Sequence, residues 1–196
     1  MIRTKKNLLT ILAFFITSQI LAQNSNCKYS RNEIDKFTKV KILITKPQRF
    51  TKFFDAAAFV YGVAEGEKKS LGVQIVTKKY LANKPSQADL DEAVVVPKGS
   101  KIIILLEDES TLELTTDTPY NGSSIFENPR TGGNGSKGYQ VITTTAIKYP
   151  VNETSSKVLT SKPAKSVRVA VENANYDYDF AKKETGAIQD ILKCTE

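Results

Sequence analysis

The sequence predicts an α+β domain that is rich in strands, with a mostly antiparallel sheet of about eight strands, one short helix and a C-terminal helix. Three observations lead to this prediction. Segments in which apolar and polar residues alternate recur along the chain, and this is the period of half-buried strands. Turn residues separate those segments at short intervals, as hairpins require. Helical spacing of apolar residues is found near the end of the chain.

The chain begins with a segment typical of a secretory leader. Three basic residues precede a mostly apolar run over residues 8–21, and Ala22 is a small residue suited to the position before a cleavage site. Thr, Ser and Gln interrupt the run, which is shorter than the roughly 20 residues of a spanning helix. We therefore predict a signal peptide over residues 1–22, cleavage after Ala22, and a periplasmic or secreted protein.

Residues 23–196 are predicted to form a single domain, with no membrane span after the leader is removed. Its 174 residues are enough to bury about 70% of the surface of the unfolded chain. The leader takes three of the 28 basic residues, so 25 basic and 21 acidic residues remain, a net charge of +4. Such a balance does not indicate a nucleic-acid partner.

Strands account for most of the first half of the domain. Alternation at Val40, Ile42 and Ile44 predicts a strand that ends before Pro47. Two further alternating segments, residues 56–64 and 70–79, flank a polar turn and predict a hairpin. A polar connection over residues 81–93 follows.

Residues 94–116 predict three strands joined by a Lys-Gly turn and an acidic turn. Ile102 to Leu106 is apolar at every position, as expected of a central strand covered on both faces. Residues 117–138 are the longest stretch predicted to be irregular, and residues 139–149 alternate again as a strand.

The last part of the domain predicts both helices and one hairpin. Asn152 is a candidate N-cap for a short helix. Residues 166–180 predict a hairpin whose second strand carries alternating aromatic residues. The tail is predicted to be helical, with one apolar stripe formed by Ile188, Ile191 and Leu192.

The stretch RTGGNGSKG, residues 130–138, has the composition of a phosphate-binding loop. A P-loop needs Gly-Lys followed by Ser or Thr, after a strand and before a helix. Here Ser136 separates Gly135 from Lys137, and a strand follows. We interpret the stretch as a surface loop between two strands, whose Arg130 and Lys137 are candidate contacts for an acidic partner.

Residues 173–184 match part of an EF-hand calcium loop. Oxygen-bearing side chains occupy its positions 1, 3, 5 and 12, namely Asn173, Asn175, Asp177 and Glu184. Position 6, which needs glycine, is Tyr178. We therefore predict a turn followed by a strand with outward aspartates, and expect no metal and no cofactor.

The chain has no histidine, which excludes Ser-His and Cys-His nucleophile pairs and histidine metal sites. The lack of histidine does not exclude hydrolysis by paired carboxylates, because that reaction needs only two acidic side chains at a set separation in a cleft. The candidates are Glu107, Glu109, Asp177 and Asp179. Each is also explained as a solvated residue of a turn or strand face.

Cys27 and Cys194 lie near the two ends of the predicted exported chain. Disulfides form and persist in exported proteins. We therefore predict a bond between these two residues, which closes a loop of 167 residues and makes thiol chemistry unavailable.

The segment Asn32-Glu33-Ile34-Asp35, followed by Phe37 and Thr38, resembles uncharacterised exported proteins of Gram-negative bacteria. These proteins carry an Asn-Glu-Ile/Val-Asp-x-Phe-Thr segment near the mature N-terminus. The resemblance implies export but no reaction, and no functional residue is transferred from it. From the residues themselves we expect Asn32 or Asp35 to cap a turn, and Ile34 and Phe37 to pack against the first strand.

These observations favour a non-enzymatic exported protein that acts by binding a partner protein or an envelope ligand, because a strand-rich domain with long polar loops suits recognition. The alternatives are a carboxylate-dependent hydrolase and a structural envelope component. Two facing carboxylates of raised pKa in a cleft would favour the enzyme. An exposed apolar patch or an uncovered edge strand would favour binding.

Overall fold

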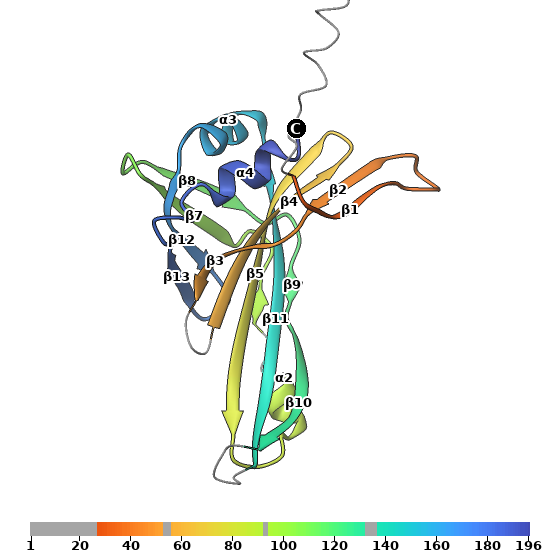
Figure 1. Cartoon of the computed structure of the whole chain (residues 1–196), viewed down its shortest axis with the longest axis vertical. Coiled ribbons are helices and arrows are strands. Elements are labelled where there is room, and N and C mark those ends of the chain that lie inside the picture. The colour runs from red at the N-terminus through yellow and green to blue at the C-terminus, as the bar shows by residue number, and fades with distance from the viewer. Residues whose placement is uncertain (1–26, 53–55, 92–93, 132–136) are drawn as a thin grey trace, which may run out of the picture.

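The computed structural model describes residues 27–52, 56–91, 94–131 and 137–196, and these residues form mainly antiparallel strands (Figure 1). Thirteen strands and three short helices lie within these ranges, so the predicted strand-rich class is confirmed, with more strands than the eight expected. The predicted leader over residues 1–22 and its cleavage after Ala22 lie outside the described residues.

The largest sheet has seven strands. Its order is β1-β2-β4-β5-β11-β10, and β3 pairs with the half of β4 that β2 leaves open. A two-residue turn joins β4 to β5, and Gly66 supplies the positive φ of 62° that this turn requires. The strands are β1 (Tyr29–Ile34), β2 (Lys41–Thr45), β3 (Gln48–Lys52), β4 (Ala56–Glu65), β5 (Lys68–Leu81), β10 (Ser123–Thr131) and β11 (Lys137–Val151).

The second sheet has four strands in the order β13-β12-β7-β8. Its strands are β7 (Lys101–Leu106), β8 (Thr111–Thr115), β12 (Ala164–Ala170) and β13 (Asn175–Asp179), and the pair β6 (Val95–Val96) and β9 (Tyr120–Asn121) forms a third, small sheet. The expectation that β7 is covered on both faces is wrong. Ile102 and Ile104 are buried against the core, but Ile103, on the other face of the strand, is only half-buried by the described residues.

One core lies between the two large sheets. The strand β5 contributes Leu71, Val73 and Ile75, which are buried as their alternation predicted. Phe50 on β3 links the sheets, because its ring stacks on Phe180 with centroids 4.6 Å apart and meets the Tyr178 ring edge-on at 5.9 Å. Residues far apart in the sequence therefore belong to a single apolar cluster.

The helices are α2 (Gln87–Asp91), α3 (Glu153–Ser161) and α4 (Ala187–Lys193). Asn152 caps α3 as predicted, since its side chain accepts a hydrogen bond from the backbone of Ser155 at 2.8 Å. The stripe on α4 is buried as predicted, and α3 and α4 lie together at one end of the sheets (Figure 1). The helix α2 lies in the segment predicted to be a polar connection, residues 81–93. Within the described ranges, no helix has both the length and the apolar character needed to cross a membrane.

Two parts of the chain project from this core. The β1–β2 hairpin extends to one side, and the ends of β5, β10 and β11 extend beyond the second sheet, with α2 beside β10 (Figure 1). The stretch 117–138, predicted to be irregular, in fact contains β9, all of β10 and the first two residues of β11. These projections matter for function because they present side chains that no second layer covers.

Candidate binding surface on the β1–β2 hairpin

Asp35 organises the turn between β1 and β2. Its Oδ1 atom accepts hydrogen bonds from the backbone N–H of Phe37 at 2.9 Å, the backbone N–H of Thr38 at 2.7 Å and the hydroxyl of Thr38 at 3.0 Å. Its own backbone N–H donates to the carbonyl of Val40 at 2.9 Å, and its carbonyl accepts from the N–H of Lys39 at 3.0 Å. Asp35 is therefore the turn-capping residue of the two expected.

The same bonds set the charge state and the shape of the turn. Hydrogen bonds from Thr38, and next from Phe37, hold the pKa of the Asp35 carboxyl below its ordinary value of 3.8. Lys39 closes the turn in the left-handed region with a φ of 60°, a conformation that costs energy in a residue other than glycine. The turn is therefore a specific structure held by a charged acceptor.

This ordered turn exposes apolar side chains. Phe37 is 94% exposed, Ile34 64% and Val40 36%. The expectation that Ile34 and Phe37 pack against the first strand is wrong, because the hairpin extends past the core and none of the described elements forms a layer over it there (Figure 1). We define these three residues, with Lys36, Lys39 and Lys41, as the hairpin tip.

The hairpin also carries the net charge of the domain. Residues 28–46 contain six basic and two acidic residues, a net charge of +4. Residues 47–196 contain nineteen of each and are neutral. The whole positive balance of residues 23–196 is thus located on one projecting hairpin.

The lysines of the tip are available for contact. Arg31 is engaged by Glu33 through two hydrogen bonds of 2.9 and 2.6 Å, and the Asp35 carboxylate is engaged by the turn. Within the described part of the chain, no carboxylate forms an ion pair with Lys36, Lys39 or Lys41. An anionic ligand would therefore meet three lysines without first breaking an ion pair.

The base of the hairpin is fixed to the C-terminal end of the fold. The predicted disulfide is present, and the Cα atoms of Cys27 and Cys194 lie 5.6 Å apart. The pairing of β1 with β2 shifts register at Ser30. The hydroxyl of Ser30 donates a hydrogen bond of 3.1 Å to the carbonyl of Ile44 at this bulge. A cavity of about 630 Å³ opens beside the disulfide, with Lys28 and Lys46 among its lining residues.

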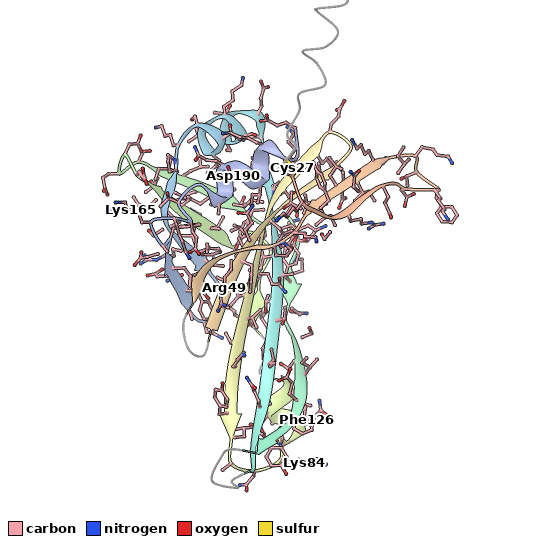
Figure 2. All side chains as sticks on the ribbon, in the orientation of Figure 1. Cys27, Arg49, Lys84, Phe126, Lys165 and Asp190 are labelled. Atoms are coloured by element: carbon pink, nitrogen blue, oxygen red, sulfur yellow. A yellow bond between two sulfur atoms is a disulfide. The ribbon has the colours of Figure 1, made fainter. Side chains whose placement is uncertain are left out.

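The candidate carboxylates are placed on or beside the uncovered face of the second sheet. Asp177 forms two hydrogen bonds of 2.7 Å with Arg168, which lowers the pKa of the Asp177 carboxyl. Glu109 pairs with Lys165, which Figure 2 labels, at 2.6 Å, and this pair, with a smaller contribution from the charge of Asp179, raises the pKa of Lys165. A general acid needs a raised pKa, so the shift at Asp177 is opposite to that role.

The partial calcium motif is a strand. Asp177 and Asp179 lie on β13 with exposed side chains, as predicted, so residues 173–184 do not form the coiled loop of an EF-hand. Glu107 follows β7, where its backbone N–H donates to the carbonyl of Pro163 at 3.0 Å. In the ranges that the structure describes, no three His, Cys, Asp or Glu side chains gather as metal ligands.

Arg130 and Lys137, the candidate partner contacts, belong to the ladder between β10 and β11. Arg130 is the partner of Gly138, and Thr131 is the partner of Lys137. Residues 132–136 of the glycine-rich stretch lie outside the described residues. The two ends of the stretch are therefore strand and not the predicted loop. Contact with an acidic partner stays a prediction.

A second exposed apolar surface lies at the far end of the long strands, where Figure 2 labels Phe126. Tyr80 and Ile125 are exposed there, at 56% and 58%. Phe126 is less exposed, at 38%, and its ring stacks on Tyr139 with centroids 5.8 Å apart. Lysines accompany this surface too, since Lys78 and Lys79 precede Tyr80 and Figure 2 labels Lys84 nearby, but Lys79 pairs with Asp89 at 3.2 Å. The hairpin tip differs because no carboxylate of the described residues pairs with its lysines.

Comparisons with protein-family models, with curated proteins and with solved structures find no match for this chain. Function is therefore inferred from the chemistry of the hairpin itself. One signal for it is visible in the sequence, where IDKFTKVK at residues 34–41 alternates apolar side chains with lysines. Ile34 and Phe37 were expected to pack against the first strand, so this signal was missed.

Proposed function

We propose that this protein is an exported, non-enzymatic binding protein, periplasmic or secreted, that attaches to an anionic ligand through the hairpin tip. The observation that carries the proposal is the exposed Phe37 on a turn held by five hydrogen bonds. Burial of an aromatic side chain is favourable by about 1.5–3 kcal/mol, and an exposed ring does not gain this free energy. A ligand that covers the ring recovers that energy.

The order of the turn supports binding. A contact loop that is already in its bound conformation loses less conformational entropy when the ligand arrives. At this tip, Asp35 fixes the backbone on both sides of Phe37 before any ligand is present. The expected recognition is therefore attachment of a preformed surface.

The distribution of charge supports an anionic ligand. The hairpin is positive while the rest of the domain is neutral, so long-range attraction orients the hairpin toward negative charge. Screening by salt should weaken this attraction, because the tip lysines are exposed.

Photo-crosslinking in cells tests the proposal. A photoreactive amino acid replaces Phe37 in one variant and Ile125, which is also exposed but lies on β10, in the control. We expect an adduct from position 37 that is absent from position 125 and is lost when Lys36→Glu and Lys39→Glu are added. Absence of any adduct at position 37 would contradict the proposed function.

A further inference from the structure

We infer that the ligand of the hairpin tip is an anionic lipid surface, into which Phe37 inserts while the neighbouring lysines contact phosphate headgroups. The inference rests on the proposed function and names the ligand class for the same surface. Four features of the tip lead to it: its shape, its lysines, the hydrogen-bonded N–H groups of the turn and the order of its residues.

The tip is a projection and not a groove (Figure 1). The cavity at the base of the hairpin is lined by residues such as Lys28, Thr45 and Gln48, and by none of the three apolar tip residues. A projecting apolar side chain cannot enclose a ligand, so it must itself enter an apolar environment. That environment is either a pocket of another protein or the boundary of a lipid layer.

The basic residues favour the lipid. Protein interfaces are enriched in Arg and depleted in Lys, whereas the free basic residues of this tip are all lysines. The one arginine of the hairpin, Arg31, is engaged by Glu33. A lysine ammonium is a hydrated point charge on a flexible stem, which suits mobile headgroups better than a fixed bidentate partner.

Four backbone N–H groups of the turn, those of residues 37–40, already have acceptors within the hairpin. The N–H groups of Phe37 and Thr38 donate to Asp35 Oδ1, and the N–H of Lys39 donates to the Asp35 carbonyl. The N–H of Val40 lies 3.4 Å from the hydroxyl of Thr38. An N–H without a partner costs several kcal/mol in hydrocarbon, so this internal bonding permits shallow insertion of the turn.

The order of the residues matches an interfacial anchor. Phe37 lies between Lys36 and Lys39 in the turn, and Lys41 is the cross-strand partner of Ile34. Apolar residues are therefore accompanied by cations in the turn and on β2. Segments that lie in a membrane interface combine apolar insertion with lysines that attract anionic lipids in the same way.

Vesicle binding tests the inference. The exported protein is mixed with vesicles of phosphatidylcholine alone, or of phosphatidylcholine with phosphatidylglycerol, and the bound fraction is measured by sedimentation. We expect binding to the anionic vesicles that weakens as salt is raised. All variants share one N-terminus, so any contribution of a leader cancels in the comparison.

Two variants and two matched controls separate the apolar from the electrostatic contribution. Phe37→Ser should lower the partition coefficient at least about tenfold. The double variant Lys36→Glu/Lys39→Glu should lower it by more than about 20-fold, since each lysine near an anionic surface is worth about fivefold. Lys182→Glu/Lys183→Glu, with the same change of charge, and Ile125→Ser should leave it unchanged. Equal unfolding midpoints confirm that the fold is intact.

The outcomes distinguish the inference from the proposed function. Equal binding to both kinds of vesicle, or binding that the tip variants leave unchanged, overturns the lipid inference. A protein adduct at position 37 without vesicle binding also overturns it, but leaves the binding function standing. An adduct with the mass of a phospholipid supports both. If the protein gives no adduct at position 37 and does not bind vesicles, both the lipid inference and the proposed function are contradicted.

Discussion

The hydroxyl of Tyr29 donates a hydrogen bond of 2.9 Å to the backbone carbonyl of Cys194, 165 residues further along the chain. Tyr29 is the first residue of β1, and Cys194 is bonded covalently to Cys27. The first strand of the hairpin is thus attached twice to the end of α4. These two attachments fix the base from which the tip projects.

Removal of the disulfide should lower stability without unfolding the protein. In the chain-entropy model, a bond that closes 167 residues is worth up to about 5 kcal/mol. The core between the two large sheets does not depend on it. We therefore expect Cys27→Ala/Cys194→Ala to unfold at lower urea concentration with its strand signal in circular dichroism retained.

Tyr29→Phe is the control for that measurement. It removes only the hydrogen bond to Cys194 and should cost about 1 kcal/mol. A double cysteine variant that loses its strand signal in native buffer would show that the core needs the covalent link. Two free thiols in the exported protein would contradict the disulfide itself.

Alternation predicted the buried faces of the central strands well. Leu71, Val73 and Ile75 on β5 are buried, and so are Val141 and Ile147 on β11. These strands are long, and each has a neighbour on both sides in the sheet. Where a strand lies inside a sheet with one face against a core, the period of two residues is sufficient to identify that face.

The hairpin tip could not be predicted in the same way. Alternation reveals which residues share a face, but not whether another layer covers that face. Ile34 has the pattern of a packed residue and is nevertheless exposed, because β1 is an edge strand beyond the core. The strand β10 was also not predicted, because its alternation is weak and it contains Pro129. A proline is tolerated there because β10 lies at the edge of the sheet.

Gly62→Ala should be destabilising because α4 packs closely against β4 at this glycine. A methyl group at Gly62 would lie 2.7 Å from both the carbonyl oxygen of Ile191 and Cγ2 of Thr195. The helix would have to move, at a cost of about 1–3 kcal/mol. Gly138→Ala, where nothing lies within 4 Å of the added methyl group, should be nearly neutral. Equal urea midpoints for the two variants would contradict this packing.

The exported protein should begin at Gln23. The leader pattern places a small residue, Ala22, directly before that position. Mass spectrometry of protein recovered outside the cytoplasm measures the N-terminus directly. Intact Met1 in that material would show that the leader is not cleaved.

The last prediction concerns Asp35, whose pKa lies below the ordinary value of 3.8. A carboxyl group with a lowered pKa in the folded state contributes stability above its unfolded pKa and loses that contribution as pH falls through the folded value. The turn should therefore be fully held above about pH 4 and loosen in stronger acid. We expect the Asp35 carboxyl to titrate below pH 3.8 by NMR, with the amide protection of Phe37 and Thr38 decreasing over the same range. A titration midpoint at or above 3.8 would contradict this.

Two substitutions at Asp35 separate the order of the turn from the charge of the tip. Asp35→Asn and Asp35→Ala each remove one negative charge, but asparagine keeps a side-chain oxygen that can accept the bonds from Phe37 and Thr38. If charge alone governed attachment to anionic vesicles, both variants would bind more tightly than the native protein, and equally. Because the turn presents Phe37 in a fixed position, we expect Asp35→Ala to bind more weakly than Asp35→Asn and to exchange those two amides faster. Equal binding and equal exchange in the two variants would show that the hydrogen bonds of Asp35 do not organise the surface.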